Sequence, residues 1–192
     1  EMNLDQIIKL RRNVKPSFFT GEVIPDSEVL ELLISANWAP THAYTEPWRF
    51  VVFSGNALND FAKFQSTLYK DSTPEHAFKE LKYQKLKSNP LLASHIIAVV
   101  VHLTEKSTIP ILEEIVATSC SVQNILLAAA SNKIAVHWTS GGMTYTPEMK
   151  SFLGFEPNDL VLGFLYLGKA PEKINKEGKR LSSISNKVTW NK

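Results

Sequence analysis

The first amphipathic segment of the chain carries apolar residues at helical spacing and then runs into two arginines. Leu4, Ile7 and Ile8 follow the i, i+3, i+4 pattern of one apolar helix face, so we expect a helix from Leu4 to Arg12. Continuing the period places Arg11 and Arg12 beside that face. A guanidinium buried without a partner costs several kcal/mol. Two alternatives follow: the arginines complement the negative end of the helix dipole with their heads in water, or they hold an anion.

The rest of the chain alternates between helical and strand patterns. Apolar spacing after Pro25 predicts a helix that Asp26 caps and that ends near Ala39. A nearly continuous apolar run from His95 to Thr104 is typical of a strand buried on both faces. The further elements predicted are strands at Trp48–Gly55, Ile134–Ser140 and Leu160–Gly168, helices at Ala57–Tyr69, Glu75–Lys87 and Pro110–Ser131, and a short helix from Thr146 to Leu153. Four strands and about six helices in this order indicate an α+β fold, with helices flanking a central sheet.

The chain shows no internal boundary. No repeat, low-complexity tract or glycine-serine linker divides its 192 residues, so we expect one domain over 1–192. No uninterrupted apolar segment follows the first helix, so we expect no signal peptide. The longest charge-free stretch, Ile115–Asn132, contains several polar residues, which favours a buried helix over a membrane span. The segment from Ala170 is polar and basic but keeps Ile184, Val188 and Trp190, so we expect it to pack on another surface.

Composition and charge exclude several classes of function. Hydrophobic residues make up 44% and charged residues 21%, as in an ordinary globular protein. A net charge of +2 is too small to predict a polyanion-binding surface, although a few local cations suffice for a small phosphorylated ligand. The one cysteine, Cys120, excludes an intrachain disulfide framework and fits a reducing, cytoplasmic compartment. The five histidines show no metal-ligand spacing, so we expect no metal site, and we expect structural roles for His95, His102 and His137, which lie in or next to strands.

Two further segments are candidate ligand contacts. The stretch APTHAYTEPWRFVVF (Ala39–Phe53) places a polar loop between two prolines, where a helix meets a strand. Ligand contacts concentrate in such loops. The stretch AVHWTSGGM (Ala135–Met143) is a strand that ends in a glycine pair, which allows a ligand to approach the backbone closely. Each segment also has an ordinary interpretation, the first as a connection anchored by Trp48 and the second as a turn.

Together these segments resemble the nitroreductase family, most closely its compact, single-domain bacterial members, over nearly the whole chain. An N-terminal helix ending in Arg-Arg-Ser is typical of the family, and so are an APxHxxxxPWxF loop, a QNLLLAA-like helix end, a W-x-(T/S)-G strand end and a GFLYLG strand. The matching residues here are Arg11-Arg12-Asn13, Ala39–Phe50, Gln123–Ala129, Trp138–Gly141 and Gly163–Gly168. Five such motifs in the family's order make the resemblance specific.

The resemblance implies a nitroreductase-like fold with a central mixed sheet, a two-fold homodimer and FMN bound at the dimer interface. The anion at the two arginines is then the FMN phosphate. The implied activity is ping-pong hydride transfer from NAD(P)H through flavin N5 to a nitro, quinone or enone acceptor. No catalytic side chain is implied, because water can supply the proton. The implied cofactor-binding residues are Arg11, Arg12, Asn13, His42, Glu46, Trp138, Thr139, Ser140, Gly141 and Arg180.

In such a dimer, His42 and Glu46 reach the flavin held by the other subunit, and the tail from about residue 170 packs on the partner. Three positions depart from the family pattern. Asn13 replaces a serine, but its amide can still donate to a phosphate oxygen. Glu46 stands where an amide or a basic residue is common, and a carboxylate repels an anionic reduced flavin. The family often has glycines where this chain has Ser131-Asn132-Lys133, and we expect Asn132 to take the left-handed cap conformation there instead.

Two alternative functions remain at this point. Glu46 supports a flavin-binding protein for storage or sensing that does not turn over. A nucleic-acid or phosphopeptide binder would need a basic stripe interleaved with aromatic residues. The lysines of Lys79–Lys87 alternate with Glu80 and apolar residues, which is typical of a solvated helix face. We therefore expect a small-molecule electron acceptor, and neither nucleic acid nor membrane, as partner.

Overall fold

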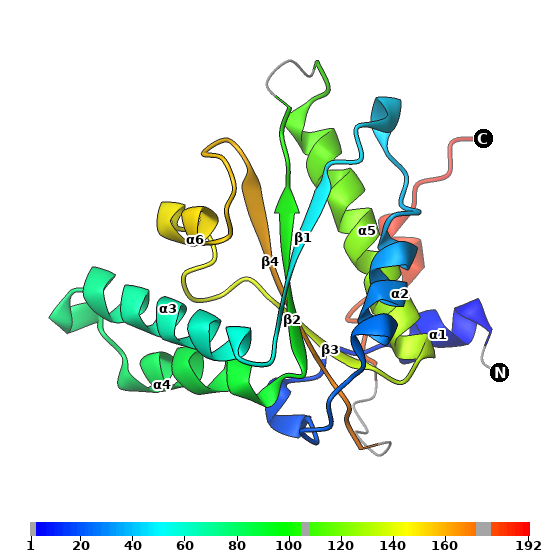
Figure 1. The fold of residues 1–192 in the computed structure, drawn as a ribbon. Helices are drawn as coiled ribbons and strands as arrows, with labels where there is room; N and C mark the ends of the chain where they lie inside the picture. The colour runs from blue at the N-terminus through cyan, green and yellow to red at the C-terminus, as the bar shows by residue number, and fades with distance from the viewer. Residues whose placement is uncertain (1–2, 105–107, 172–177) are drawn as a thin grey trace.

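A four-stranded sheet with helices on both faces forms the centre of the computed structural model, which describes residues 3–104, 108–171 and 178–192 (Figure 1). The α-helices are α1 (Leu4–Leu10), α2 (Asp26–Ala36), α3 (Ala57–Ser72), α4 (Glu80–Ser88), α5 (Ile111–Ser131) and α6 (Pro147–Phe152). The strands are β1 (Trp48–Ser54), β2 (His95–Val101), β3 (Ala135–Thr139) and β4 (Leu160–Gly168). Short 3-10 helices are η1 (Pro16–Phe18), η2 (His42–Tyr44), η3 (Glu75–Ala77), η4 (Asn89–Leu92) and η5 (Ile184–Lys187). The expected α+β fold is confirmed.

The strand order is β1-β2-β4-β3, and all three pairings are antiparallel. The described residues therefore form an antiparallel sheet, whereas the family resemblance implied a mixed one. The reason lies in the connections: α3 and α4 form a hairpin that returns the chain to the end of the sheet where β1 stops (Figure 1). The next strand, β2, must then run against β1. Both β1 and β3 are left with a free edge within this sheet.

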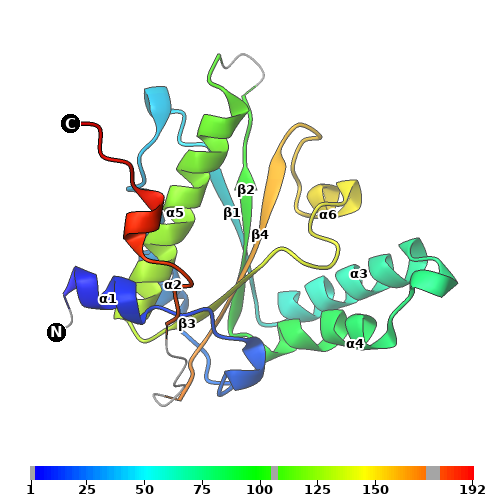
Figure 2. The ribbon, with the colours of Figure 1, turned by 180° about the vertical axis from the view of Figure 1, so that it is seen from behind.

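Alternate residues of β2 pack into two separate hydrophobic cores, one on each face of the sheet, because successive side chains of a strand point to opposite faces. Ile97 and Val99 pack with residues of α2 and α5. Ile96, Ala98 and Val100 pack with residues of α3 and α6. Figures 1 and 2 show α1, α2 and α5 on one face of the sheet and α3, α4 and α6 on the other. The continuous apolar run of the sequence is thus a strand buried on both faces, as expected.

The long helix α5 crosses the whole of one face of the sheet. Val122, Ile125, Leu126 and Ala129 are buried in the core between the sheet and α2. Its length and composition alone would let it cross a membrane, yet these residues pack as in the core helix of a soluble protein. At about 1.5 Å per residue, its 21 residues span about 30 Å, which separates the two ends of this face of the molecule.

Helix α1 is shorter and less buried than its pattern predicted. It ends at Leu10 instead of Arg12, and Ile7 is its only residue classed as buried, while Leu4 and Ile8 are 63% and 48% exposed. The expected apolar face therefore lies only partly against the core of this chain, because α1 packs across the C-terminal end of α5 (Figures 1 and 2).

Two other expected helix boundaries differ from the structure. The predicted helix over Glu75–Lys87 is interrupted, because the Lys79 amide donates to the Tyr69 hydroxyl at 3.0 Å and Phe78 stacks on the Tyr69 ring. Asp26 does not cap α2, since its carboxylate bonds to the His95 ring instead. By contrast, the Thr146 side chain accepts the Met149 amide at the start of α6, as expected for a cap.

Candidate functional site

The arginine pair lies where α1 ends. The Arg11 amide still donates to the Ile7 carbonyl, but Arg11 has an extended ψ of 132°, which turns the chain away from the helix axis. The Arg12 guanidinium donates to the Lys9 and Arg11 carbonyls, each at 2.7 Å. Arg12 therefore does complement the C-terminal end of the helix, as the ordinary interpretation expects.

Arg11 has no such explanation. Its side chain is half-buried, and the described residues provide it with no hydrogen bond and no ion pair. Burial lowers the pKa of Arg11, and the positive charges of Arg12 and Arg180 lower it further. The adjacent Arg11 and Arg12 and the distant Arg180 thus bring three guanidinium groups close enough for Arg12 and Arg180 to repel Arg11. An anion among them would relieve both the desolvation of Arg11 and the repulsion.

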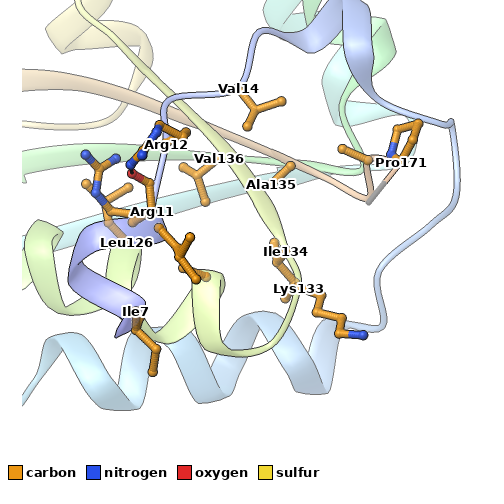
Figure 3. A pocket seen from close by; sticks show the side chains of 13 residues that line it. Ile7, Arg11, Arg12, Val14, Leu126, Lys133, Ile134, Ala135, Val136 and Pro171 are labelled. Carbon is orange, nitrogen blue, oxygen red and sulfur yellow. Dashed lines mark hydrogen bonds between the residues drawn. The ribbon is translucent and has the colours of Figure 1, made fainter. Parts of the chain in front are cut away.

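A pocket of about 350 Å³ opens beside these arginines (Figure 3). Its walls are mostly apolar and come from α5 and from β3, with Leu126 and Val136 among them. Arg11 and Arg12 lie toward one end of the pocket, and Lys133 lies toward the other. The pocket therefore combines an apolar wall with cations, which suits an anionic ligand that also has an uncharged body.

Lys133 is a pocket residue that the sequence pattern did not reveal. We expected Asn132 to take the left-handed conformation after α5, but Asn132 has φ −94° and Lys133 has φ +55°. The Asn132 side chain donates to the Ala128 carbonyl at 3.0 Å, which keeps Asn132 in the last helical turn. The left-handed residue that ends the helix is therefore Lys133, one residue later than expected, and Lys133 lines the pocket.

The basic tail returns to the arginines through a glycine. A Cβ placed on Gly178 would lie 2.2 Å from Nη2 of Arg12, so a side chain at this position would displace the Arg12 guanidinium. Arg180 follows two residues later and contributes its charge to Arg11. The resemblance implied Arg180, whereas Gly178 was missed because the tail has no periodic pattern.

Asn13 joins the arginine segment to the free edge of β3. The Trp138 amide donates to Oδ1 of Asn13 at 2.7 Å, and the Val14 amide donates to the Val136 carbonyl at 2.9 Å. The structure therefore brings the segment of Arg11, Arg12 and Asn13 to Trp138 of β3. The Asn13 oxygen is occupied by this contact, which leaves its amide N–H groups as donors for a ligand.

Thr139, Ser140 and Gly141 follow Trp138 at the end of β3. The Thr139 carbonyl packs against Gly163 of β4, where a Cβ would approach it to 2.6 Å. The Thr144 hydroxyl donates to the Gly141 carbonyl at 2.7 Å and holds the turn. Ser140 and Gly141 are exposed, and within the described chain no hydrogen bond links them to the arginine segment.

His42 and Glu46 are not brought to the arginines. Their loop, residues 41–46, packs on the first turn of α5, whereas the arginine pocket includes the last turns of the same helix (Figures 1 and 2). Nδ1 of His42 lies 2.5 Å from Oε2 of Glu113, and the Thr45 hydroxyl donates to Oε1 of Glu114 at 2.9 Å. Neither glutamate stands out in the sequence, because acidic residues in a first helical turn have an ordinary role toward the helix dipole.

Two of the other histidines have structural partners. Nε2 of the buried His95 lies 2.8 Å from the Asp26 carboxylate, and Nδ1 of His102 lies 3.0 Å from the Asp159 carboxylate. The described residues contain no group of three or more side chains that could hold a metal ion.

Comparison with known proteins gives relatives along most of the chain. The model described as "Nitroreductase family" matches residues 8–169. The Bacillus subtilis protein named "Putative NAD(P)H nitroreductase YfhC" is 31% identical over 177 residues, which cover 88% of this chain and 87% of that protein. A nitroreductase-like family protein from Bacillus cereus has a TM-score of 0.82 at 25% identity and covers 100% of this chain and 97% of its own. The FMN-dependent nitroreductase NfnB of Mycobacterium smegmatis, solved with NADPH, has the same fold, with a TM-score of 0.75 at 17% identity over 98% of this chain and 97% of its own.

Proposed function

The chain belongs to the nitroreductase family, and on that premise we propose that it is an FMN-dependent oxidoreductase with NAD(P)H as co-substrate. One observation carries the proposal. Arg11 is half-buried, has no partner within the described chain, and lies among the charges of Arg12 and Arg180. A cluster of this kind is unfavourable in an empty protein and favourable around a phosphate.

The residues present fit the phosphate end of FMN. Guanidinium groups can donate two parallel hydrogen bonds to phosphate oxygens, and Asn13 adds an amide donor on the same segment. The apolar wall that includes Leu126 and Val136 suits an uncharged body attached to the phosphate. Trp138, Thr139, Ser140 and Gly141 continue from this wall along β3 and the turn that follows, and we assign them to the cofactor as well.

Bound FMN would supply the redox chemistry, with hydride uptake from NAD(P)H in one half-reaction and electron delivery to an acceptor in the next. The chain's own residues bind and orient: Arg11, Arg12 and Arg180 hold the charged end, and Asn13 ties that segment to β3. No side chain is assigned a proton transfer. The acceptors we propose are small nitro, quinone or enone compounds, and the location we propose is the cytoplasm.

We further propose that two copies of the chain build each site. His42 and Glu46 lie at the far end of α5 from the arginines, so they serve a flavin only if a second copy brings its loop to the arginine end. An exposed apolar surface is present for such an association: Leu30, Ile34 and Trp38 follow helical spacing on and after α2, at 56%, 45% and 84% exposure. Exposed apolar surface of this extent is typical of an interface.

The tail supports the same assembly. Leu181, Ile184 and Trp190 are 91%, 72% and 80% exposed in the single chain. Apolar side chains in an otherwise basic segment gain free energy when another surface covers them. We propose that the tail from about residue 170 packs on the partner subunit.

The decisive experiment measures flavin. The purified protein should be yellow and carry about one FMN per chain. Arg11→Ala should weaken FMN binding at least about tenfold, since hydrogen bonds to charged groups contribute about 1.5 to 3 kcal/mol each. Lys9→Ala is the matched control, because it removes a cation two residues earlier whose described partner is Asp5.

The outcomes separate the proposal from its alternatives. A colourless protein that takes up no added FMN contradicts the cofactor assignment. Equal FMN affinity in Arg11→Ala and Lys9→Ala contradicts the phosphate site. The arginines then only complement the negative end of the helix dipole. A flavoprotein that does not oxidise NADH or NADPH, with or without acceptor, is the storage or sensing protein instead.

A further inference from the structure

The loop that carries His42 is held in an unfavourable backbone conformation. Ala43, Tyr44 and Glu46 have φ values of +49°, +55° and +42°. Non-glycine residues in this region cost about 1 kcal/mol or more each, and they persist only where the surroundings hold them. The loop therefore needs anchors, and the anchors decide where its outward side chains lie.

Three anchors hold the loop through its backbone and through Thr45. The Thr41 hydroxyl accepts the Glu46 amide at 3.0 Å, and the Arg49 guanidinium donates to the Glu46 carbonyl at 2.9 Å. The Thr45 hydroxyl donates to the carboxylate of Glu114, whose side chain is buried. These contacts account for the loop path without any contribution from Glu113.

Glu113 is not one of these anchors of the loop. Among the described residues, its carboxylate has the His42 ring as its one hydrogen-bond partner, with Oε2 at 2.5 Å from Nδ1. Both side chains are about half exposed, so the contact adds little to the core. Glu113 also lies in the first turn of α5, where a negative charge interacts favourably with the helix dipole.

We propose that Glu113 is the positioning residue for His42. Its carboxylate accepts the Nδ1–H of the imidazole, which fixes the ring orientation and the tautomer and leaves Nε2 as the atom presented outward. This inference rests on the proposed function, in which His42 reaches the FMN held by the partner subunit. Glu113 then contributes to flavin binding only through His42.

The first test needs no flavin. ¹⁵N NMR of histidine-labelled protein in alkaline buffer reports which ring nitrogen of His42 carries the proton. We expect Nδ1–H in the unaltered protein, a shift toward Nε2–H in Glu113→Ala, and retention of Nδ1–H in Glu113→Gln, whose amide oxygen still accepts. The control is Glu31→Ala, an exposed glutamate of α2 whose side chain makes no hydrogen bond or ion pair within the described chain. The same tautomer in the unaltered protein and in Glu113→Ala overturns the inference.

The second test is a double-mutant cycle on the FMN dissociation constant. We expect about three- to tenfold weaker binding in Glu113→Ala, and no further loss when Glu113→Ala is added to His42→Ala. Losses that multiply, or wild-type affinity in Glu113→Ala while His42→Ala is weakened, overturn the positioning role. Wild-type affinity in His42→Ala overturns the shared site itself, and the NMR result then decides the Glu113–His42 contact on its own.

Discussion

Adding a methyl group to the backbone is expected to affect stability at Gly163 and cofactor binding at Gly178. At Gly163 the added Cβ would meet the Thr139 backbone at 2.6 Å, and the φ of +139° suits glycine alone. At Gly178 it would meet the end of the Arg12 side chain, which can move away.

We therefore predict that Gly163→Ala lowers the free energy of unfolding by about 2 to 4 kcal/mol. Gly178→Ala should leave that free energy nearly unchanged but weaken FMN binding, because the Arg12 guanidinium is displaced. Urea denaturation and a flavin titration of both variants give the comparison. Equal stability losses in the two variants would contradict this account of the tail.

Tyr166 gives a prediction for alkaline pH. Burial raises its pKa from 10.0 to about 12, against a smaller lowering by a hydrogen bond with Gln65. The unfolded chain therefore loses the phenolic proton first as the pH rises. The contribution of Tyr166 to stability is complete below pH 10 and is lost between pH 10 and 12, at about 2 to 3 kcal/mol in all.

The measurement is urea denaturation of the unaltered protein and of Tyr166→Phe at several pH values in that window. The difference in unfolding free energy between the two proteins should move by this amount in favour of the phenylalanine variant. A difference that stays constant with pH shows that the phenol ionises with equal ease in both states.

At the scale of elements, local patterns predicted the type and order of the helices and strands, because periodicity and caps depend on neighbours in sequence. The buried strand β2 and the Thr146 cap of α6 are examples. The strand order could not be predicted in this way, and neither could the break before α4, which depends on Tyr69 from another helix. His42 was identified through the family motif, but its partner Glu113 lies 71 residues away, and no local pattern connects the two.

The α6 cap gives the prediction at this scale. Thr146→Ala removes the acceptor for the Met149 amide and should lower the free energy of unfolding by about 1 kcal/mol. Thr146→Ser keeps the hydroxyl and should retain most of that stability. Thermal denaturation of the two variants tests the cap, and equal losses would place the role of Thr146 in its methyl group instead.

At the scale of the whole molecule, the exposed apolar side chains of α2 and the tail predict a stable dimer. Light scattering on dilute, flavin-loaded protein should give twice the mass of the chain, and the interface should bury about 2,000 Å² or more. Removing the residues after 178 should weaken both the dimer and FMN binding. A monomer that keeps its flavin and its activity contradicts the shared site.

The length of α5 has a consequence for mixtures of variants. Arg11 and His42 lie toward opposite ends of a helix about 30 Å long, so in a two-fold dimer each site takes one residue from each chain. Chains carrying Arg11→Ala and chains carrying His42→Ala are each defective in pure form. When the two are unfolded together and reassembled, every hybrid contains one unaltered site and one doubly altered site. With random pairing, about a quarter of all sites regain full function, so two defective proteins complement each other. A dimer of one Arg11→Ala chain and one normal chain keeps one of its two sites unaltered.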